Sequence, residues 1–351
     1  MQMHLIIATL FFVTVFIAFF EERLKESNKL LILAGYAIFM IYLATTKSIE
    51  HTADALAYER YFYKNDNPLI EIMTEPTFIY MSRIIIAFGG TLVTLFFIYA
   101  VLSIPAKIFL FYKMTPYIFT ALLIYIPVYF EVQDLIQIRV SAAAMFLLAS
   151  LFPLSRRQHL IAFLLIVCGI LFHYSAVAYL PLLFIGNMKL NKTWRIIVAV
   201  LVPMFFLLYL MKKDLFFLIP SSLTAGKIDY YQESSQKGEW EELAPLYKNF
   251  FFLAKCGLLY VLLYYYDIIV RRNKMAPLII NLFIASILFL LGMSTIPVLA
   301  SRVSDLYGII DCIVFTYAFY IFRPKYIVKI GIAIVGFYML VYNMLFTEYF
   351  T

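Results

Sequence analysis

The sequence has few charged residues: Asp, Glu, Lys and Arg together make up 14% of its 351 positions, whereas 64% are hydrophobic. A soluble domain carries about 25% charged and about 45–50% apolar residues. A soluble chain of this composition could not cover its surface, so a soluble fold is excluded. The apolar runs are long and uninterrupted rather than alternating, which favours membrane-spanning helices over a barrel.

Cysteine is scarce, and the common motifs of nucleotide-dependent enzymes are absent. The three cysteines, Cys168, Cys256 and Cys312, all lie inside apolar runs, a placement that fits neither a disulfide framework nor a metal site. The sequence has no Walker loop, no glycine-rich dinucleotide fingerprint, no HExxH and no Gly-x-Ser-x-Gly elbow. Soluble nucleotide sugars are therefore not expected as donors. No resident cofactor is expected, although Asp54 and Glu75 could share a divalent metal ion.

The apolar runs predict an all-α, polytopic membrane protein with about twelve transmembrane helices in a single domain, residues 1–351. The predicted spans lie near residues 4–20, 29–46, 76–112 with a break at Gly89-Gly90, 117–130, 136–153, 158–173, 175–186, 193–211, 249–270, 275–292, 303–322 and 326–346. The 175–186 segment is short, and we do not expect it to cross the membrane fully.

Basic residues are concentrated in alternate short connections between the spans. They are Arg23, Lys25, Lys29, Lys113, Arg156, Arg157, Lys189, Lys192, Arg195, Arg271, Arg272, Lys274, Arg323, Lys325 and Lys329. Because cytoplasmic loops carry an excess of Lys and Arg, this alternation places both chain ends outside. The same bias accounts for the formal net charge of +7, so nucleic acid is not an expected partner.

Two predicted outer loops, residues 47–75 and 212–248, are long enough to contribute to a functional site. In the first loop Asp54, Tyr58 and Tyr61 would share one face of a helix. A carboxylate beside two aromatic rings suits a sugar, but an interfacial helix with tyrosines in the aromatic belt has the same pattern. The loop ends at Glu75, which could interact with a helix dipole or act as a general base. The second loop could contact glycan or be disordered.

Two arginines are predicted near the outer ends of spans. Arg139 would cost several kcal/mol at that depth unless it is paired or faces water. Asp134 could be its partner only if the helix ended or bent there, whereas a phosphate suits the two-pronged geometry of guanidinium. Arg302 could pair with Asp305, or it could bracket a diphosphate together with Arg139. Lys107 is predicted near the inner end of its span.

Two further polar features complete the pattern. His173-Tyr174-Ser175 lies at the outer end of a span and predicts a polar notch. Lys255 and Asp311 are charges inside the membrane that could pair with each other.

The order of these short motifs resembles that of the EpsG-like branch of the Wzy polysaccharide polymerases. The motifs are Asp54-x3-Tyr58, Glu75-Pro76-x-Phe78, Gln137-Ile138-Arg139, His173-Tyr174-Ser175 and Arg302-x4-Tyr307. The resemblance implies a GT-C-like glycosyltransferase in the bacterial cytoplasmic membrane, with its active site on the periplasmic side. Such an enzyme joins undecaprenyl-diphosphate-linked oligosaccharides into O-antigen, capsule or exopolysaccharide, and a chain-length regulator protein is a possible partner.

The resemblance also implies roles for individual residues. Arg139 and Arg302 would bind the diphosphate, Asp54, Glu75 or His173 would accept the proton of the attacking hydroxyl, and Tyr58, Gln137 and Tyr174 would bind the substrate. A single displacement would invert the anomeric centre, whereas a carboxylate nucleophile would proceed in two steps. Two alternatives stay open: an O-antigen ligase, which shares the donor, and a lipid-linked oligosaccharide flippase or transporter, which should carry charge along a path across the whole membrane.

Overall fold

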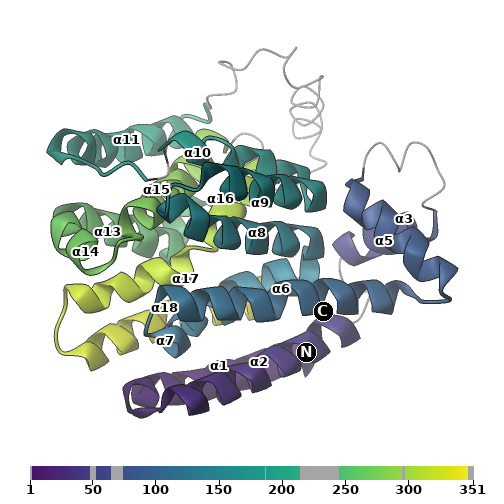
Figure 1. Ribbon diagram of the computed structural model, residues 1–351. Helices are drawn as coiled ribbons and strands as arrows, with labels where there is room; N and C mark the ends of the chain where they lie inside the picture. Colours follow the sequence, from purple (N-terminus) through teal and green to yellow (C-terminus); the bar gives the residue numbers. More distant parts are fainter. Residues whose placement is uncertain are drawn as a thin grey trace. The chain divides into compact units, whose positions relative to one another are not determined.

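The computed structural model describes residues 2–47, 53–64, 74–185, 187–213, 245–294 and 297–346, and every regular element in these ranges is helical (Figure 1). The chain divides into two compact units, Met1–Leu183 with Asp311–Thr351, and Phe184–Ile310. We call them the first and the second unit. The single transmembrane domain expected from the sequence stays a prediction.

The elements follow one another without a repeated order. In the first unit they are α1 (Gln2–Phe20), η1 (Glu21–Arg23), α2 (Glu26–Thr46), α3 (Ala53–Tyr63), α5 (Pro76–Ala87), α6 (Leu92–Met114), α7 (Ile118–Ile124), η2 (Tyr125–Ile136), α8 (Ile138–Ser155), α9 (His159–Phe172), η3 (Tyr174–Tyr179), α17 (Asp311–Val314), η7 (Phe315–Tyr320) and α18 (Lys325–Phe346). The short α10 (Leu182–Ile185) lies at the junction, and the second unit holds α11 (Lys192–Leu210), η6 (Leu246–Lys248), α13 (Phe250–Tyr264), α14 (Tyr266–Arg272), α15 (Ala276–Gly292) and α16 (Pro297–Gly308).

The helices confirm an all-α polytopic membrane protein. Within the described ranges, seven helices are long and apolar enough to cross a membrane, or up to nine if each of two bent helix pairs is one span. Four further apolar helices are shorter. The count of twelve therefore stays a prediction. The expected short segment at 175–186 consists of the 3-10 helix η3 and the four-residue α10.

The predicted break at Gly89-Gly90 is confirmed. Helix α5 ends at Ala87, and Gly89 adopts a φ of 75°, a conformation that residues with a Cβ rarely adopt. The backbone N–H of Gly90 donates to the carbonyl of Ile85 at 2.8 Å, which closes the end of the helix. The chain then turns into α6, which begins at Leu92.

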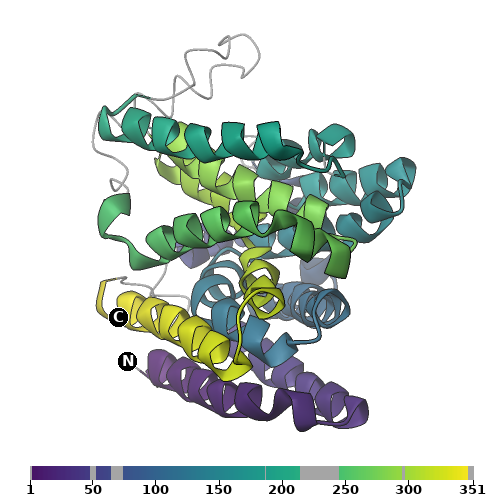
Figure 2. The ribbon, with the colours of Figure 1, turned by 90° about the vertical axis from the view of Figure 1, so that its left-hand side faces the viewer.

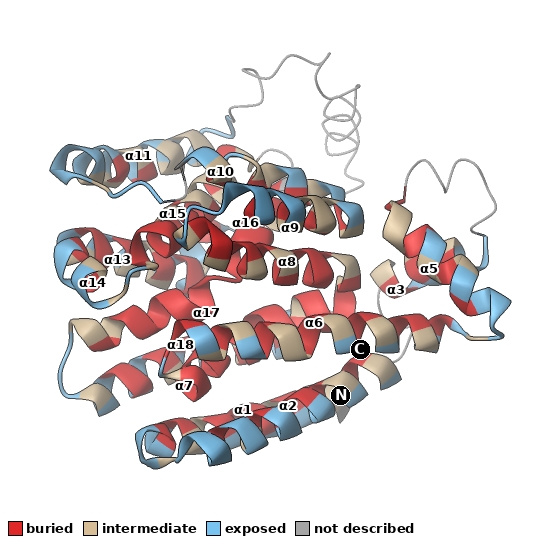
Figure 3. Ribbon diagram, in the orientation of Figure 1, coloured by how far each residue is buried: buried red, intermediate tan, exposed pale blue. Residues whose placement is uncertain are grey.

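The region between the predicted spans 117–130 and 136–153 differs from the prediction. Helix α7 continues without a break into η2, a π-helix that runs to Ile136, and most of this segment is buried (Figure 3). A π-helical stretch is rare and is often found at functional sites. It carries Glu131, Gln133 and Asp134 into the interior of the first unit, where the sequence pattern suggested a connection between spans.

A network of buried polar groups holds η2 in place. Asp134 accepts hydrogen bonds from Lys107 at 3.1 Å, from Tyr125 at 2.7 Å and from Ser141 at 2.5 Å. Asp134 was only a conditional partner for Arg139; in the structure the cation that contacts Asp134 is Lys107, and Arg139 pairs with Glu75.

The start of α1 and the end of α18 lie on the same side of the first unit, because the two helices pack against each other and run in opposite directions (Figure 2). At one end Glu22 pairs with Lys325. At the other end His4 and Asn343 both contact Glu131. The placement of both chain ends outside the membrane stays a prediction.

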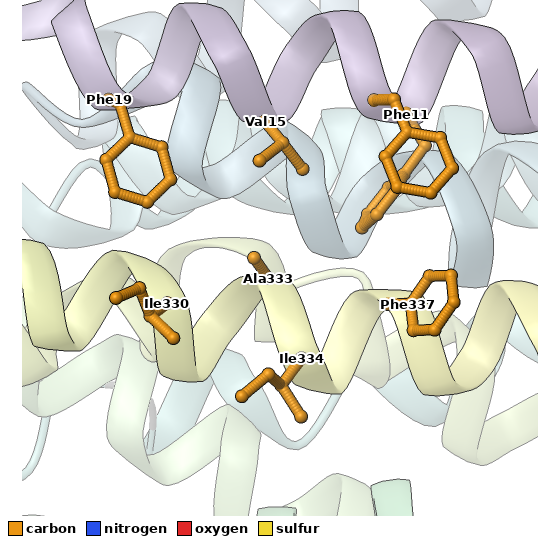
Figure 4. Close-up of a pocket in the computed structure, with 8 residues that line it drawn as sticks. Phe11, Val15, Phe19, Ile330, Ala333, Ile334 and Phe337 are labelled. Atoms are coloured by element: carbon orange, nitrogen blue, oxygen red, sulfur yellow. The ribbon is translucent and has the colours of Figure 1, made fainter.

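An apolar groove of 260 Å³ lies between α1 and α18 (Figure 4). Its lining consists of Phe11, Phe12, Val15, Phe19, Ile330, Ala333, Ile334 and Phe337. Both helices are candidate membrane spans, so hydrocarbon is the natural environment of this groove.

Replacing Gly336 by alanine is expected to destabilise the first unit by about 1–3 kcal/mol, the usual cost of overpacking. A Cβ at Gly336 would lie 2.2 Å from the backbone carbonyl oxygen of Leu123 and 2.9 Å from the ring of Phe11. Gly331 on the same helix is the matched control, because a Cβ there meets no atom within 4 Å. Unfolding in detergent should show a loss for Gly336→Ala alone. Equal stability of the two variants would contradict the close packing of α18 on α7.

Candidate active site

The carboxylate of Glu75 is the centre of a polar cluster in the first unit. Glu75 is the last residue before α5, and Pro76 begins that helix, where a missing backbone N–H costs no hydrogen bond. One carboxylate oxygen accepts a hydrogen bond from the guanidinium of Arg139. The other lies 2.8 Å from Nδ1 of His173 and 3.3 Å from the backbone N of Tyr174. The side chain is almost completely buried.

Three helices bring these residues together although they are far apart in the sequence. Arg139 is the second residue of α8, and His173 directly follows α9, which packs along α8. The hydroxyl of Thr77, in the first turn of α5, donates to the carbonyl of Leu171 at 2.7 Å and ties that turn to the end of α9. All three contributions come from helix ends that the sequence predicts on the outer side.

Aromatic rings surround the guanidinium of Arg139. Its central carbon lies 5.2 Å from the ring centroid of Tyr58, 5.6 Å from that of Phe78 and 6.0 Å from that of Tyr61. A cation over an aromatic face gains about 0.5–2 kcal/mol. Nε of Arg139 is buried and has no hydrogen-bond partner among the described residues. The arginine therefore keeps a donor that Glu75 does not use.

The cluster keeps Glu75 ionised. Burial alone raises the pKa of this carboxyl, but the hydrogen bond from His173 and the charge of Arg139 outweigh burial and lower the pKa to about 2. A carboxylate with so low a pKa is a weak proton acceptor. In this arrangement Glu75 orients its neighbours more readily than it accepts a proton itself.

His173 has the geometry of a general base supported by a carboxylate. When Nδ1–H donates to Glu75, the lone pair of the neutral imidazole is on Nε2. A carboxylate that fixes the tautomer of a histidine in this way also stabilises the imidazolium formed after proton transfer. Tyr174, the next residue, is partly exposed, and its hydroxyl lies 3.5 Å from the carbonyl oxygen of Thr74.

The structure thus brings five of the predicted site residues together in the first unit. Tyr58, Glu75, Arg139, His173 and Tyr174 form one cluster. Gln137 lies at the junction between η2 and α8, where its backbone N–H donates to the carbonyl of Val132 at 2.8 Å. Asp54 is half-buried on α3, on the same helix as Tyr58.

Arg302 lies on α16 in the second unit. Its proposed joint action with Arg139 stays a prediction, and so does the pairing of Asp311 with Lys255, because each pair is divided between the two units. In the first unit Tyr129 donates a hydrogen bond to Asp311 at 2.6 Å, and in the second Lys255 donates to Ser286 at 3.2 Å. The predicted loop at 212–248 lies mostly outside the described residues, and so do large parts of the loop at 47–75.

Sequence reasoning missed Lys47 as a member of this region. Lys47 directly follows α2, and its side chain is buried rather than part of an exposed loop. The sequence feature that could have identified Lys47 is a single basic residue at a predicted outer helix end, next to a loop rich in aromatic residues. Within the described ranges no three His, Cys, Asp or Glu side chains could jointly hold a metal ion; a divalent ion shared by Asp54 and Glu75 stays untested.

The model of the EpsG family matches residues 37–350 of the chain. A comparison with curated proteins and one with solved structures each gave no match. The matched range contains every residue of the cluster around Glu75.

Proposed function

The chain belongs to the EpsG family, which is associated with polysaccharide polymerase and glycosyltransferase-like activity, and from this premise we propose that it polymerises lipid-diphosphate-linked oligosaccharides. The donor would be a growing glycan on undecaprenyl diphosphate, and the acceptor the next lipid-linked repeat unit. The reaction would take place on the outer face of the bacterial cytoplasmic membrane, within a GT-C-like fold.

The observation that carries this proposal is the contact of Glu75 with both Arg139 and His173. A sugar diphosphate is a good leaving group, so the enzyme mainly has to stabilise negative charge and remove a proton. Arg139 supplies a guanidinium with an unused donor, and His173 supplies a base oriented by a carboxylate. The cation that would stabilise negative charge and the base that would remove the proton therefore both contact the carboxylate of Glu75.

In the proposed reaction, His173 accepts the proton of an acceptor hydroxyl as its oxygen attacks the anomeric carbon of the donor. The new glycosidic bond forms while the bond between that carbon and the diphosphate oxygen breaks, and the lipid diphosphate leaves with the electron pair. Arg139 stabilises the charge that develops on the leaving group, and Arg302 is proposed to assist. A single displacement of this kind inverts the anomeric centre.

The sugar would be held by the groups that surround these two residues. Tyr58 and Tyr174 would stack on sugar rings, and Gln137 would donate or accept hydrogen bonds with hydroxyl groups. Asp54 is the second candidate for the base, because it is half-buried on the same helix as Tyr58. A chain-length regulator protein would be a partner in the cell.

The proposal predicts that purified protein in nanodiscs converts a lipid-diphosphate-linked repeat unit into a ladder of integer repeats. Products would be separated by length after the lipid is released. A correctly folded protein that gives no ladder with several repeat units, but transfers a finished glycan to a lipid-core acceptor, would be a ligase. Movement of the lipid-linked unit across vesicles without bond formation would indicate a flippase.

A further inference from the structure

Lys47 is a buried cation that forms no ion pair within the part of the chain that the structure describes. Only 5% of the residue is exposed. Its ammonium group donates to the backbone carbonyl of Leu135 and lies 4.2 Å from the ring centroid of Phe96. Neither partner carries a negative charge, and no described carboxylate forms an ion pair with Lys47. The charges of Asp54 and Asp134 both favour the protonated form of Lys47.

Lys107 is a buried lysine that, unlike Lys47, has a carboxylate partner. Its ammonium contacts both carboxylate oxygens of Asp134 at 3.1 Å and also donates to Ser141 at 2.9 Å. Buried charges are normally paired in this way, because an unpaired charge loses its hydration without compensation. Burial lowers the pKa of Lys47 to about 7, and the charges of Asp54 and Asp134 oppose that shift only in part. An anion beside Lys47 would supply the missing partner.

The aromatic rings of Phe96 and Tyr58 connect Lys47 with the candidate active site. The ring of Phe96, beneath Lys47, packs edge-on against the ring of Tyr58, with 6.4 Å between the centroids. Tyr58 in turn contacts the guanidinium of Arg139. Lys47 and Arg139 therefore approach one cluster from α2 and from α8. Both carry buried N–H groups that the described residues do not fully use.

We propose that Lys47 is a second anion-binding residue of this site and contacts one phosphate group of a diphosphate whose other phosphate group contacts Arg139. The inference rests on the proposed function, since it concerns the donor of that reaction. Lysine is a compact charge on a flexible stem of four carbons, so the ammonium can exchange the Leu135 carbonyl for a phosphate oxygen. Two cations in one site favour a diphosphate over a monophosphate.

The test compares the binding of farnesyl diphosphate and farnesyl monophosphate to the full chain in nanodiscs. Lys47→Met is expected to weaken diphosphate binding by about 10–100-fold, the usual effect of losing one charge-assisted hydrogen bond, with a much smaller effect on the monophosphate. Lys29→Met is the matched control, because Lys29 is also a buried lysine of α2 but pairs with Glu26 at 2.8 Å. Lys47→Arg keeps the charge and should retain the preference for diphosphate.

The pH dependence of binding gives a second readout that a purely structural lysine would not change. Lys47 loses its charge as the pH rises through about 7 in the unliganded protein, so diphosphate affinity should fall between pH 6 and pH 9. In Lys47→Arg the side chain stays charged, so the fall should be smaller. The comparison of wild type with Lys47→Arg removes the contribution of the titrating probe, because both proteins receive the same probe. It also removes the contributions of Asp54, Asp134 and Lys107, because both proteins contain these residues.

The outcomes separate this inference from the proposed function. Wild type that binds neither farnesyl phosphate and forms no glycan ladder would overturn the function itself. Loss of diphosphate binding in Arg139→Ala, with unchanged binding and pH profile in folded Lys47 variants, would overturn only the role of Lys47. If Lys47→Met does not fold, the comparison of Lys47→Arg with wild type across pH decides the question.

Discussion

Arg139→Ala is expected to lower the rate of glycan polymerisation by about 10²–10³-fold, the effect of removing one preorganised donor from a developing negative charge. The variant also leaves the carboxylate of Glu75 without its cation. Arg139→Lys keeps a positive charge but loses the planar fork that binds phosphate through two hydrogen bonds, so it should recover only part of the rate. Product ladders from single-turnover reactions would provide the measurement.

Arg60 is the matched control for Arg139. It is an exposed arginine on α3, the same helix that supplies Tyr58. Arg60→Ala should polymerise like wild type. If Arg139→Ala unfolds, folded Arg139→Lys still tests the site, because lysine can keep the ion pair with Glu75 but lacks the fork that binds phosphate. Full activity in folded Arg139→Ala would place the diphosphate elsewhere.

His173→Gln is expected to reduce kcat by about 10²–10⁴-fold, the usual contribution of a positioned general base. The KM for the donor should change little, because the diphosphate contacts belong to Arg139. His159→Gln is the matched control, since His159 is the exposed first residue of α9 and His173 directly follows the last. Equal rates for the two variants would show that His173 is not the base and would leave Asp54 as the candidate.

The pH profile of polymerisation distinguishes Glu75 from His173 as the base. The pKa of Glu75 is lowered to about 2, so its ion pair stabilises the fold fully above the ordinary value of 4.5 and is lost as the pH falls toward 2. Glu75 does not change its charge between pH 5 and pH 9. An acid limb of kcat in that range would therefore come from another group and exclude Glu75 as the base. A rate that stays constant down to pH 4 would agree with Glu75 as the base.

The sequence alone determined the class of the molecule and the position of its polar groups along the chain. Uninterrupted apolar runs require helices because lipid offers no partner to backbone N–H and C=O groups. The break at Gly89 followed from the conformational freedom of glycine. Short motifs at helix ends marked Glu75, Arg139 and His173, because a polar residue inside an apolar run is costly unless it serves a purpose.

Only the tertiary structure decided which of these groups are partners. Periodicity within a helix relates residues three or four positions apart, whereas Glu75 meets Arg139 and His173 across 64 and 98 positions. The π-helix η2 changes the direction of the side chains after α7. Asp134 pairs with Lys107, and Arg139 pairs with Glu75. Lys47 has the sequence pattern of a loop residue. Its burial without an ion pair among the described residues arises because α2, α6 and η2 pack around it, and no local pattern encodes that packing.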